Sequence, residues 1–427
     1  MVFKEVLLHF IWRFRLFDQL NLRTVDGEVL SVDDVGIYNH NAGPDFEFAK
    51  IRIAGTLWSG QVEVHVNEDD WLLHQHQLDK RYDATILHVV WENSNKSIHR
   101  TDGSSIPTLE LKHLVDTNML ARYADLMHNL NWVPCSEQLP SLNSVTINSW
   151  LARMTVGRME QKFEAIAILL AKTNYDWERV FLIILGRAFG MKVNAAAFEA
   201  LALRIDLKLV HKYQSNPIKI ESIMFGLAGF LHQEEDDYAW KLQDEFLYLK
   251  HLHHLEEIQV EEWRFMRMRP YNFPTYRLAQ FTALLIHKSY WFSYIQEIEN
   301  LNDLYAIFDS SSMNSYWATH YRFGVETAQH SINWSLSFKI HLTINCIIPM
   351  LFAYGTFMKQ DKYKEKALDW LHSLPSENNQ ITKEFARYNI KCLSAADSQA
   401  LLYMKKQYCD NKQCLSCTIG LAILKTN

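Results

Sequence analysis

The chain has 427 residues, of which 48% are hydrophobic, with only 14 Gly and 9 Pro and a formal charge of −6. This composition excludes a disordered, collagenous or low-complexity protein, and the mild charge excludes a generally basic nucleic-acid binder. At roughly 100–200 residues per domain, the length predicts two or three domains with cores of their own. Residues 1–115 carry the whole acidic excess, with 11 Lys/Arg against 17 Asp/Glu. Contact of this part with nucleic acid would therefore require a metal ion or basic groups from elsewhere in the chain.

The most apolar stretches lack the features of targeting or membrane segments. Residues 2–18 are interrupted by charges, and no small-residue cleavage site follows them. Residues 342–358 contain Asn345 and Pro349 and fall short of the roughly 20 apolar residues that a membrane span needs. Six unevenly spaced Cys are not typical of a secreted disulfide framework. We therefore predict a cytoplasmic protein without a membrane partner.

The first 115 residues predict a mixed α/β domain, because helical spacing of apolar residues gives way to alternation and then returns. The predicted elements are a helix at 2–18, strands at 28–35, 45–53 and 56–66, a helix at 67–84, a strand at 85–91 and an edge strand at 107–111. The second and third strands form an antiparallel hairpin about Ala54-Gly55. The strand at 85–91 is almost wholly apolar, which is typical of a buried strand that follows a crossover helix in a parallel unit.

Beyond residue 115 no strand alternation is evident, and apolar residues recur at helical spacing. The predicted helices are 119–129, 145–171, 177–189, 195–210, 218–232, 236–253, 273–299, 342–358, 363–372, 381–388 and 395–409. We therefore predict an α+β fold class. Residues 1–115 form a mixed-sheet α/β domain, and residues 116–427 form a large all-α domain with a C-terminal Cys cluster.

Acidic residues and a histidine lie on the predicted hairpin. Glu63 and His65 are two residues apart on one strand, so their side chains share a face. A hairpin that turns about Ala54 places Asp45 opposite Glu63, unless a bulge at 59–60 shifts the register by one residue. Two carboxylates about 5 Å apart at Cβ repel each other, whereas a hard ion such as Mg²⁺ or Mn²⁺ binds such pairs and can activate water towards a phosphodiester. The alternative is a pair of solvated acids without a metal.

This arrangement resembles the signature of the PD-(D/E)XK nuclease superfamily: Asp45 after a proline, 17 intervening residues, then Glu63 and His65 as Glu-x-His. The predicted order of helix, three strands, helix and strand is also similar to that superfamily's core. The resemblance implies that Asp45 and Glu63 bind a Mg²⁺ or Mn²⁺ ion, that Glu5 of the first helix assists, and that DNA or RNA is cleaved. His65 replaces the usual Lys; a neutral imidazole can exchange a proton near pH 7 but carries no fixed charge. This departure leaves open a catalytically inactive scaffold that binds nucleic acid or protein.

Histidines and acids at 65–88 allow a second kind of metal site. Asp70 and His74 are four residues apart and share a face of the predicted helix, and His88 lies on the strand that can neighbour His65. Imidazoles and carboxylates suit an open catalytic zinc site. A zinc hydrolase built on His65, His74 and His88 is therefore an alternative function, with Asp70 or Asp79 orienting an imidazole. Solvated helix histidines and a hydrogen-bonded core His88 are the structural alternative.

Three cysteines follow a predicted helix end, at Cys409, Cys414 and Cys417. Thiolates at this spacing can converge on one soft ion, and a fourth ligand completes a tetrahedron. Cys392 or Cys135 can supply that ligand. Cys135 with the C-terminal trio resembles the iron–sulfur site of some PD-(D/E)XK nucleases of the recombination and adaptation type, in which the cluster fastens the chain ends. We predict a structural Zn²⁺ ion or iron–sulfur cluster, with ordinary buried thiols as the alternative.

Arg267, Arg269 and Arg277 lie among aromatic residues. Arg and aromatic side chains together can hold a phosphate backbone and stack bases, so the three residues are predicted nucleic-acid contacts; helix packing is the alternative. The sequence has no Walker A loop, dinucleotide-binding glycine pattern or G-x-S-x-G elbow, which disfavours ATPase, dehydrogenase and esterase functions.

Segments spread along nearly the whole chain are similar to the bacterial domain-of-unknown-function 2851 family. They are NAGPDF (41–46), VEVHVNEDDWLLHQHQLDKRYDATILHVV (62–90), RPYNFPTYRLAQ (269–280), YWATHY (316–321) and YCDNKQCLSCTIG (408–420). This resemblance implies no particular activity.

Overall fold

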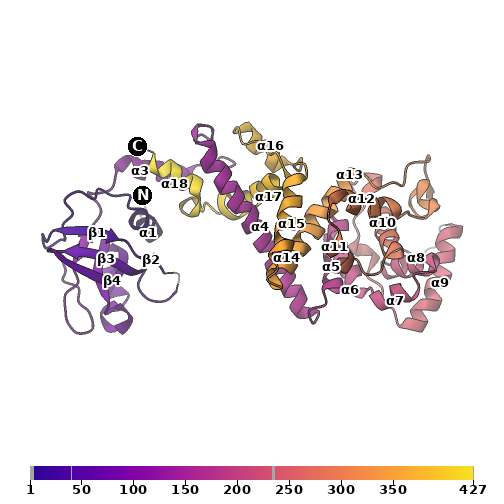
Figure 1. The fold of residues 1–427 in the computed structure, drawn as a ribbon, viewed down its shortest axis with the longest axis horizontal. Helices are drawn as coiled ribbons and strands as arrows, with labels where there is room; N and C mark the ends of the chain where they lie inside the picture. The colour runs from indigo at the N-terminus through magenta and orange to yellow at the C-terminus, as the bar shows by residue number, and fades with distance from the viewer. Residues whose placement is uncertain (1–3, 40, 233–235, 427) are drawn as a thin grey trace. The chain divides into compact units, whose positions relative to one another are not determined.

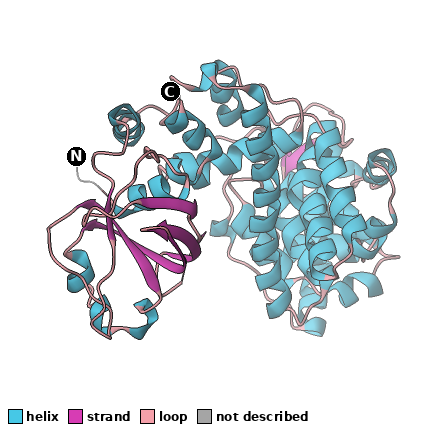
Figure 2. Ribbon diagram, turned by 60° about the vertical axis from the view of Figure 1, so that its left-hand side comes forward, coloured by secondary structure: helices cyan, strands magenta, loops and turns pink. Residues whose placement is uncertain are grey.

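The computed structural model describes residues 4–39, 41–232 and 236–426. These residues form an α+β protein, with a mixed sheet near the N-terminus followed by a mostly helical region (Figures 1 and 2). The chain divides into two compact units. The first, which we call the sheet unit, comprises Met1–Trp150, Arg387–Ile390 and Met404–Asn427; the second, the helical unit, comprises Leu151–Ala386 and Lys391–Tyr403. The two ends of the chain thus belong to one compact unit, whereas the sequence predicts a single division after residue 115.

The sheet unit is built around six strands. Its elements are α1 (Glu5–Arg13), β1 (Leu30–Asp34), β2 (Ile37–Tyr38), β3 (Phe46–Ile53), β4 (Thr56–Asn67), α2 (Asp70–Leu73), the 3₁₀ turns η1 (His76–Leu78) and η2 (Lys80–Tyr82), β5 (Thr85–Glu92), β6 (Thr108–Glu110), α3 (Thr117–His128), η3 (Leu139–Ser141), the π-helical segment η8 (Met404–Cys409), the 3₁₀ turn η9 (Cys414–Ser416) and α18 (Thr418–Lys425). The strand order is β1-β3-β4-β5-β6, with β2 also paired to β3. The β1–β3 and β3–β4 pairs are antiparallel, and the β4–β5 and β5–β6 pairs are parallel.

The β3–β4 hairpin brings Asp45 opposite Glu63. Its turn consists of Ala54-Gly55, both with positive φ, a conformation that matches the twist of the flanking strands. A bulge within 46–49 then shifts the register, so that Phe46 pairs with Val62 and the preceding Asp45 comes level with Glu63. The bulge therefore lies on β3, and the alternative position at 59–60 on β4 is wrong.

The segment between β4 and β5 is not the single helix predicted at 67–84. α2 is one turn long, and Gln75 has a φ of 60°, a left-handed conformation that stops the helix. Trp71 and Tyr82 are buried together beneath the loop after β5, so packing of these rings onto the sheet outweighs the helical pattern of the sequence. As a result His74 and His76 do not continue a helix but lie beside β4.

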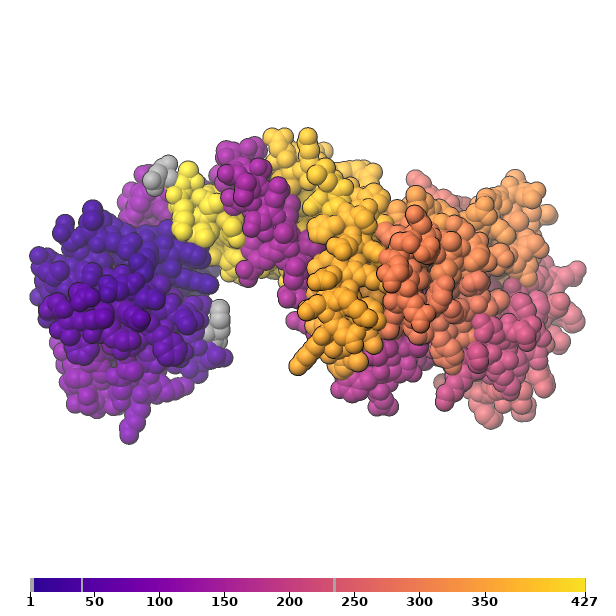
Figure 3. All heavy atoms as spheres, in the orientation of Figure 1, coloured from indigo at the N-terminus to yellow at the C-terminus, as the bar shows by residue number. Residues whose placement is uncertain are grey.

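The last residues of the chain pack within the sheet unit. α18 lies against α3, and the Arg122 side chain donates a hydrogen bond to the carbonyl of Leu424 (3.2 Å). Lys412, in the loop before η9, donates to the carbonyl of Met127. Figures 1 and 3 show these C-terminal residues in yellow beside the indigo and purple N-terminal part of the same unit. The Cys-containing end of the chain is thus part of the sheet unit.

The helical unit contains, in chain order, most of α4 (Ser144–Lys172), α5 (Trp177–Phe189), α6 (Ala195–Arg204), α7 (Leu207–Lys212), α8 (Pro217–Leu227), α9 (Asp237–His253), η4 (Val260–Glu262), η5 (Pro270–Asn272), α10 (Pro274–His287), α11 (Phe292–Glu297), α12 (Leu301–Ser310), η6 (Ser315–Ala318), α13 (Leu336–Leu342), the π-helical segment η7 (Thr343–Ile347), α14 (Ile348–Phe357), α15 (Asp361–Ser373), α16 (Gln380–Arg387) and α17 (Ala395–Tyr403). A small antiparallel hairpin, β7 (His320–Arg322) and β8 (Val325–Glu326), also lies here. The prediction of helices alone after residue 115 is therefore wrong at this hairpin, because strands of two or three residues are too short to show alternation.

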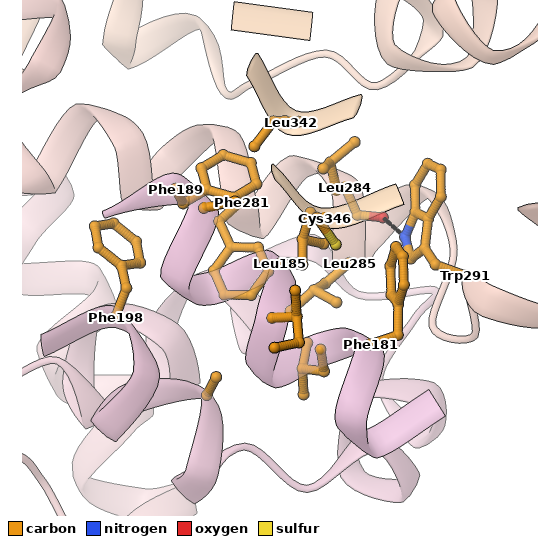
Figure 4. Packing of buried hydrophobic residues seen from close by; sticks show 14 of the residues in the cluster. Phe181, Leu185, Phe189, Phe198, Phe281, Leu284, Leu285, Trp291, Leu342 and Cys346 are labelled. Carbon is orange, nitrogen blue, oxygen red and sulfur yellow. Dashed lines mark hydrogen bonds between the residues drawn. The ribbon is translucent and has the colours of Figure 1, made fainter. Parts of the chain in front are cut away.

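The helical unit has an extensive apolar core (Figure 4). Phe189 and Phe281 face each other with ring centroids 4.9 Å apart, and the Trp291 indole donates a hydrogen bond to the carbonyl of Leu284 (3.1 Å). Cys346 is fully buried in the same core. By length and composition, the described residues include one helical stretch that could cross a membrane, Leu336–Phe357, and 72% of its most apolar window is buried inside the protein. That degree of burial is typical of a core helix.

Candidate metal centre

Backbone N–H groups on the two arms of the hairpin hold the carboxylates of Asp45 and Glu63 in place. The backbone N–H of Asp45 donates to Oε2 of Glu63 (3.0 Å), and the backbone N–H of Val64 donates to Oδ2 of Asp45 (3.0 Å). Each carboxylate therefore receives a main-chain hydrogen bond that holds its orientation. The two acids that the sequence predicts as neighbours are brought together at the end of the hairpin.

A first set of ligand atoms, which we call the acidic group, consists of Glu5, His9 and Asp45. Their ligand atoms all lie within 4.8 Å of one another. Glu5 and His9 are four residues apart on α1 and so project from the same side of the helix. Nε2 of His9 is 3.1 Å from Oδ2 of Asp45 and 3.6 Å from Oε1 of Glu5, while its Nδ1 is 3.2 Å from the hydroxyl of Tyr38.

A second set, the imidazole group, consists of His65, His74 and His76, whose ring nitrogens also lie within 4.8 Å of one another. Nε2 of His65 is 3.1 Å from Nδ1 of His74. Oε1 of Glu63 is 3.5 Å from Nε2 of His65 and 3.3 Å from Nε2 of His76. One oxygen of Glu63 therefore faces the imidazole group, while the other accepts the N–H of Asp45 in the acidic group.

His88 on β5 orients His65 on β4. Nδ1 of His65 is 2.8 Å from Nε2 of His88, and both rings are buried. If Nδ1 of His65 carries the proton and donates it to His88, the lone pair of Nε2 points towards His74 and Glu63. A buried partner that fixes the tautomer of an imidazole is characteristic of metal-binding histidines.

The cluster is buried at one end and open to solvent at the other. His88, His65 and Glu63 are at most 5% exposed, whereas the side chains of Asp45 and Glu5 are 19% and 42% exposed. His74 is classed among the exposed residues of the sheet unit. A small substrate group can thus approach from the side of Glu5 and His74, and the buried residues provide a rigid base.

Burial and neighbouring charges raise the pKa values of Glu63 and His9 and lower that of His65. Burial, aided by the neighbouring Asp45 carboxylate, raises the pKa of Glu63 to about 9. Burial, followed by repulsion from His88 and His76, lowers the pKa of His65 to about 2. Burial opposes the charged form of His9, but the Asp45 and Glu5 carboxylates outweigh it and raise the pKa of that ring. Without a bound cation the buried end therefore favours neutral groups.

The donor atoms fit a divalent transition metal. Nε2 of His9 and Nε2 of His76 are buried, and each faces a carboxylate oxygen, at 3.1 Å from Asp45 and 3.3 Å from Glu63. A divalent ion can be ligated by an imidazole nitrogen and a carboxylate oxygen that lie this close together. Three imidazole nitrogens with a carboxylate are typical of Zn²⁺ and of other first-row ions, whereas Mg²⁺ prefers oxygen ligands alone.

The other acids predicted near the site have different contacts. Oδ2 of Asp70 accepts the backbone N–H of Asn67 (3.0 Å), and Asp79 is paired with Arg81. Neither carboxylate is hydrogen-bonded to an imidazole among the described residues. His9 is a site residue that the sequence analysis missed, although its position one helical turn after Glu5 was a usable signal.

The cysteines form a separate group in the sheet unit. Burial raises the pKa of Cys135 to about 12, and the neighbouring thiols of Cys417 and Cys414 add to the shift. Burial also raises the pKa of Cys409, and the neighbouring thiols of Cys135, Cys417 and Cys414 add to that shift. The four thiols therefore influence one another electrostatically. Cys392 belongs to the helical unit, where its charged neighbour is Asp397.

The kind of metal site that the four cysteines could form depends on how far apart their sulfurs lie. A single zinc ion with Zn–S bonds of about 2.3 Å holds its thiolates about 3.8 Å apart. Within the part of the chain that the structure describes, the cysteines do not form a set of three sulfurs within 4.8 Å of one another. Backbone N–H groups of Ile419 and Gly420, at the start of α18, hydrogen-bond to the sulfur of Cys417. Such bonds stabilise a thiolate, which is the form of Cys that binds metal ions.

The three arginines predicted to contact nucleic acid differ in exposure. Arg267 and Arg269 are exposed. Arg277 is only 6% exposed; its guanidinium donates to Gln280 and Asn272, 2.6 Å each, and stacks on Phe338. The burial of Arg277 and its contacts within the helical core are not typical of a residue that contacts nucleic acid.

The fold and this site define an α+β protein with a carboxylate–imidazole cluster on a mixed sheet. The chain matches, over residues 5–380, the family described as "Protein of unknown function (DUF2851)". It therefore belongs to the DUF2851 family, as the sequence segments indicated. Comparisons with curated proteins and with solved structures found no match.

Proposed function

We propose that the sheet unit is a divalent-metal-dependent phosphodiesterase that cleaves DNA or RNA. The observation that carries this proposal is the convergence of the acidic group and the imidazole group on Glu63, with one side of the cluster open to solvent. Adjacent divalent ions can stabilise both the attacking and the leaving oxygen of an in-line displacement at phosphorus. A cluster with two neighbouring sets of ligand atoms suits this reaction better than an isolated hydrolytic zinc.

The donor sets suggest which ions would bind. The imidazole group together with Glu63 would hold Zn²⁺ or Mn²⁺, because imidazole nitrogen favours these ions over Mg²⁺. The acidic group would hold Mn²⁺ or Mg²⁺ through Asp45 and Glu5, with His9 as a nitrogen ligand or proton acceptor. Bound ions would activate water and neutralise charge on the phosphate.

His65 has a different role from the one that the Glu-x-His motif implies. Both of its ring nitrogens are engaged by other imidazoles, and its low pKa keeps it neutral. We assign His65 to metal binding and not to proton transfer. His9, next to Asp45 and nearer the open side, is the better candidate for exchanging a proton with solvent.

The pairing of the strands is compatible with the proposed nuclease, although the segment between β4 and β5 is not the crossover helix that the resemblance implies. The site lies on α1, β3 and β4 of a core in which β4 and β5 are parallel, as the resemblance to the PD-(D/E)XK superfamily implies. Exposed Arg267 and Arg269 remain proposed contacts to nucleic acid, and the cytoplasm remains the proposed location. His65 stands where the superfamily motif has Lys. In this proposal its imidazole is a nitrogen ligand of the metal ion.

The test is cleavage of single- and double-stranded DNA and RNA by the purified full-length protein with Mn²⁺, Zn²⁺, Mg²⁺ or EDTA. We expect cleavage with Mn²⁺ or Zn²⁺, none with EDTA, and none by Asp45→Asn. Asp33→Asn is the matched control, because Asp33 is an exposed acid of the same sheet that pairs with Arg52. Full cleavage by Asp45→Asn would refute the proposal, whereas binding without cleavage by the wild type would indicate a nucleic-acid scaffold.

We also propose that Cys135, Cys409, Cys414 and Cys417 hold a structural iron–sulfur cluster in preference to a single Zn²⁺ ion. The mutual electrostatic influence of the four thiols and the N–H groups directed at Cys417 support a metal site at these residues. Anaerobically purified protein should show iron, sulfide and visible absorbance. Stoichiometric zinc without iron would instead establish the zinc alternative.

A further inference from the structure

A pocket of about 310 Å³ in the helical unit is lined by three cationic side chains. Arg158 and Lys162 come from α4 and Arg187 from α5, while His341 and Asn345 contribute polar atoms from α13 and η7. None of the residues that line it in the described chain is an Asp or Glu. The pocket is entirely within the helical unit and is separate from the proposed nuclease site.

The position of Lys162 follows from a defect in the neighbouring helix. In η7 the N–H of Ile348 bonds to the carbonyl of Thr343, five residues back. The next donor in that pattern would be residue 349, which is Pro and has no N–H, so the carbonyl of Ile344 loses its helical partner. Nζ of Lys162 donates to this carbonyl instead (3.1 Å). This hydrogen bond holds the Lys162 ammonium at the pocket. The ammonium has three N–H donors, so the other two are available to a ligand.

The positive charges of the pocket are only partly balanced. Arg158 donates to the side-chain oxygens of Gln161 (2.7 Å) and Gln399 (3.3 Å), which are neutral. Arg158 and Lys162 are four residues apart on one helix face, where like charges repel. Glu377 lies near enough to favour both cations, but it does not line the pocket. Arg187 forms an ion pair with Glu199 (3.3 Å) and remains 47% exposed.

His341 does not supply a negative or accepting atom to offset these charges. Its Nε2–H donates to the carbonyl of Ala188 (2.9 Å), and its Nδ1 is 3.2 Å from Nδ2 of Asn345. With Nδ2 turned towards the ring, both nitrogens of His341 are engaged. The remaining lining residues are apolar, among them Ile166, Ile184 and Met191.

We propose that this pocket binds a small organic phosphate, with the phosphate at Arg158, Lys162 and Arg187 and the organic part against the apolar wall. Arg recognises phosphate oxygens in a bidentate fashion, and Lys adds a point charge, so a dianionic group matches three cations. The volume is at the lower end of the range for small-molecule sites, which is appropriate for a mononucleotide-sized ligand.

The experiment is titration calorimetry of the full-length protein with AMP, inorganic phosphate and adenosine, at pH 6.5, below the pKa of Lys162, and in EDTA so that the proposed metal centre cannot contribute. We expect AMP to bind with a Kd below about 1 mM, phosphate to compete with it, and adenosine to bind far more weakly. Arg187→Gln should weaken AMP binding about 10-fold or more, because a charge-assisted hydrogen bond is lost. Arg153→Gln, an exposed position on the same helix α4 outside the pocket, should bind like the wild type.

Absence of AMP binding to the wild type would overturn the proposal, as would unchanged affinity in Arg187→Gln or equal affinity for adenosine. Lys162→Met provides a second variant, and it should also lose AMP binding if it folds. Because Arg187 is largely exposed, Arg187→Gln keeps the test decisive even if Lys162→Met does not fold. Asp45→Asn should leave AMP affinity in EDTA unchanged, which separates this pocket from the proposed nuclease site.

Discussion

The backbone N–H of Asp45 donates to Glu63, and the N–H of the residue after Glu63 donates back to Asp45, each at 3.0 Å. Two carboxylates that would otherwise repel are thus placed side by side by the main chain. Preorganisation of this kind lowers the cost of binding an ion and of catalysis at it.

Amide substitutions separate the charge of these two residues from their structural role. Asp45→Asn and Glu63→Gln each retain an oxygen that can accept the same backbone N–H, so we expect folded proteins with nearly unchanged melting temperatures. Loss of a metal-binding charge should reduce cleavage about 100-fold or more, since bound ions supply several kcal/mol of transition-state stabilisation. Cleavage rates with Mn²⁺, compared with those of Asp33→Asn, measure the effect. A folded variant with wild-type rates would show that the carboxylates are only structural.

His88 should act on metal affinity through His65. His88→Leu removes the hydrogen-bond partner of Nδ1 of His65, so we expect Mn²⁺ or Zn²⁺ affinity to fall about 10- to 100-fold. His88→Gln retains a polar group near the position of Nε2 and should recover part of the affinity. Competition with a chromophoric chelator measures both values. Equal affinities of the Leu and Gln variants would contradict an orienting role.

Substitution of Cys417 and of Cys392 should have different effects on the metal content of the protein. Cys417→Ser should abolish iron binding at the proposed cluster and lower the melting temperature, because a metal bound by ligands far apart in the sequence stabilises the folded state. Cys392→Ser is the matched control, since Cys392 lies outside the group and is partly exposed. Metal analysis and absorbance spectra of the two variants give the answer. Equal iron content in both would exclude the assignment.

The titration of Lys162 should make the stability of the wild type depend on pH. Burial, together with repulsion from Arg158, lowers the pKa of Lys162 to about 7, whereas the unfolded chain has the ordinary value of about 10.4. Between these values the unfolded state binds more protons, so this residue makes the wild type more stable as the pH rises from about 7 to about 10. Below about 7 both states are protonated and the full penalty remains.

Replacing Lys162 with Met removes this titration. The free energy of unfolding of Lys162→Met relative to the wild type should therefore be highest near pH 7 and should fall towards pH 10. Urea denaturation at several pH values in EDTA measures the difference. Arg153→Gln should show a difference from the wild type that does not vary with pH. A pH-independent difference for Lys162→Met would contradict the assigned burial.

Much of the sheet was predictable because its periodicity is local. Alternation at 45–53 and 56–66 and the turn at Ala54-Gly55 define the hairpin, and a buried strand after the next segment defines the parallel pair. The helix predicted at 67–84 failed because its pattern is amphipathic, yet burial of Trp71 and Tyr82 draws the chain onto the sheet. Secondary structure over such a short segment is decided by tertiary packing, which periodicity does not encode.

The candidate metal centre was predictable only in part. Asp45, Glu63 and His65 follow from strand pairing, and His88 follows from the neighbouring strand. The positions of His74 and His76 depend on the left-handed Gln75, a conformation that Gln rarely adopts and that no sequence signal announces. Cys135 and the cysteines nearly 300 positions later belong to one compact unit, which sequence spacing alone does not determine.

The most direct test of the central claim is anomalous X-ray scattering from crystals of the protein loaded with Mn²⁺. The account requires a manganese peak within bonding distance of the Glu63 carboxylate, with ligands from the imidazole group or the acidic group. It also requires that the peak be absent from crystals of Glu63→Gln prepared in the same way. A wild-type crystal without manganese at this cluster, at a Mn²⁺ concentration that supports binding in solution, would contradict the account.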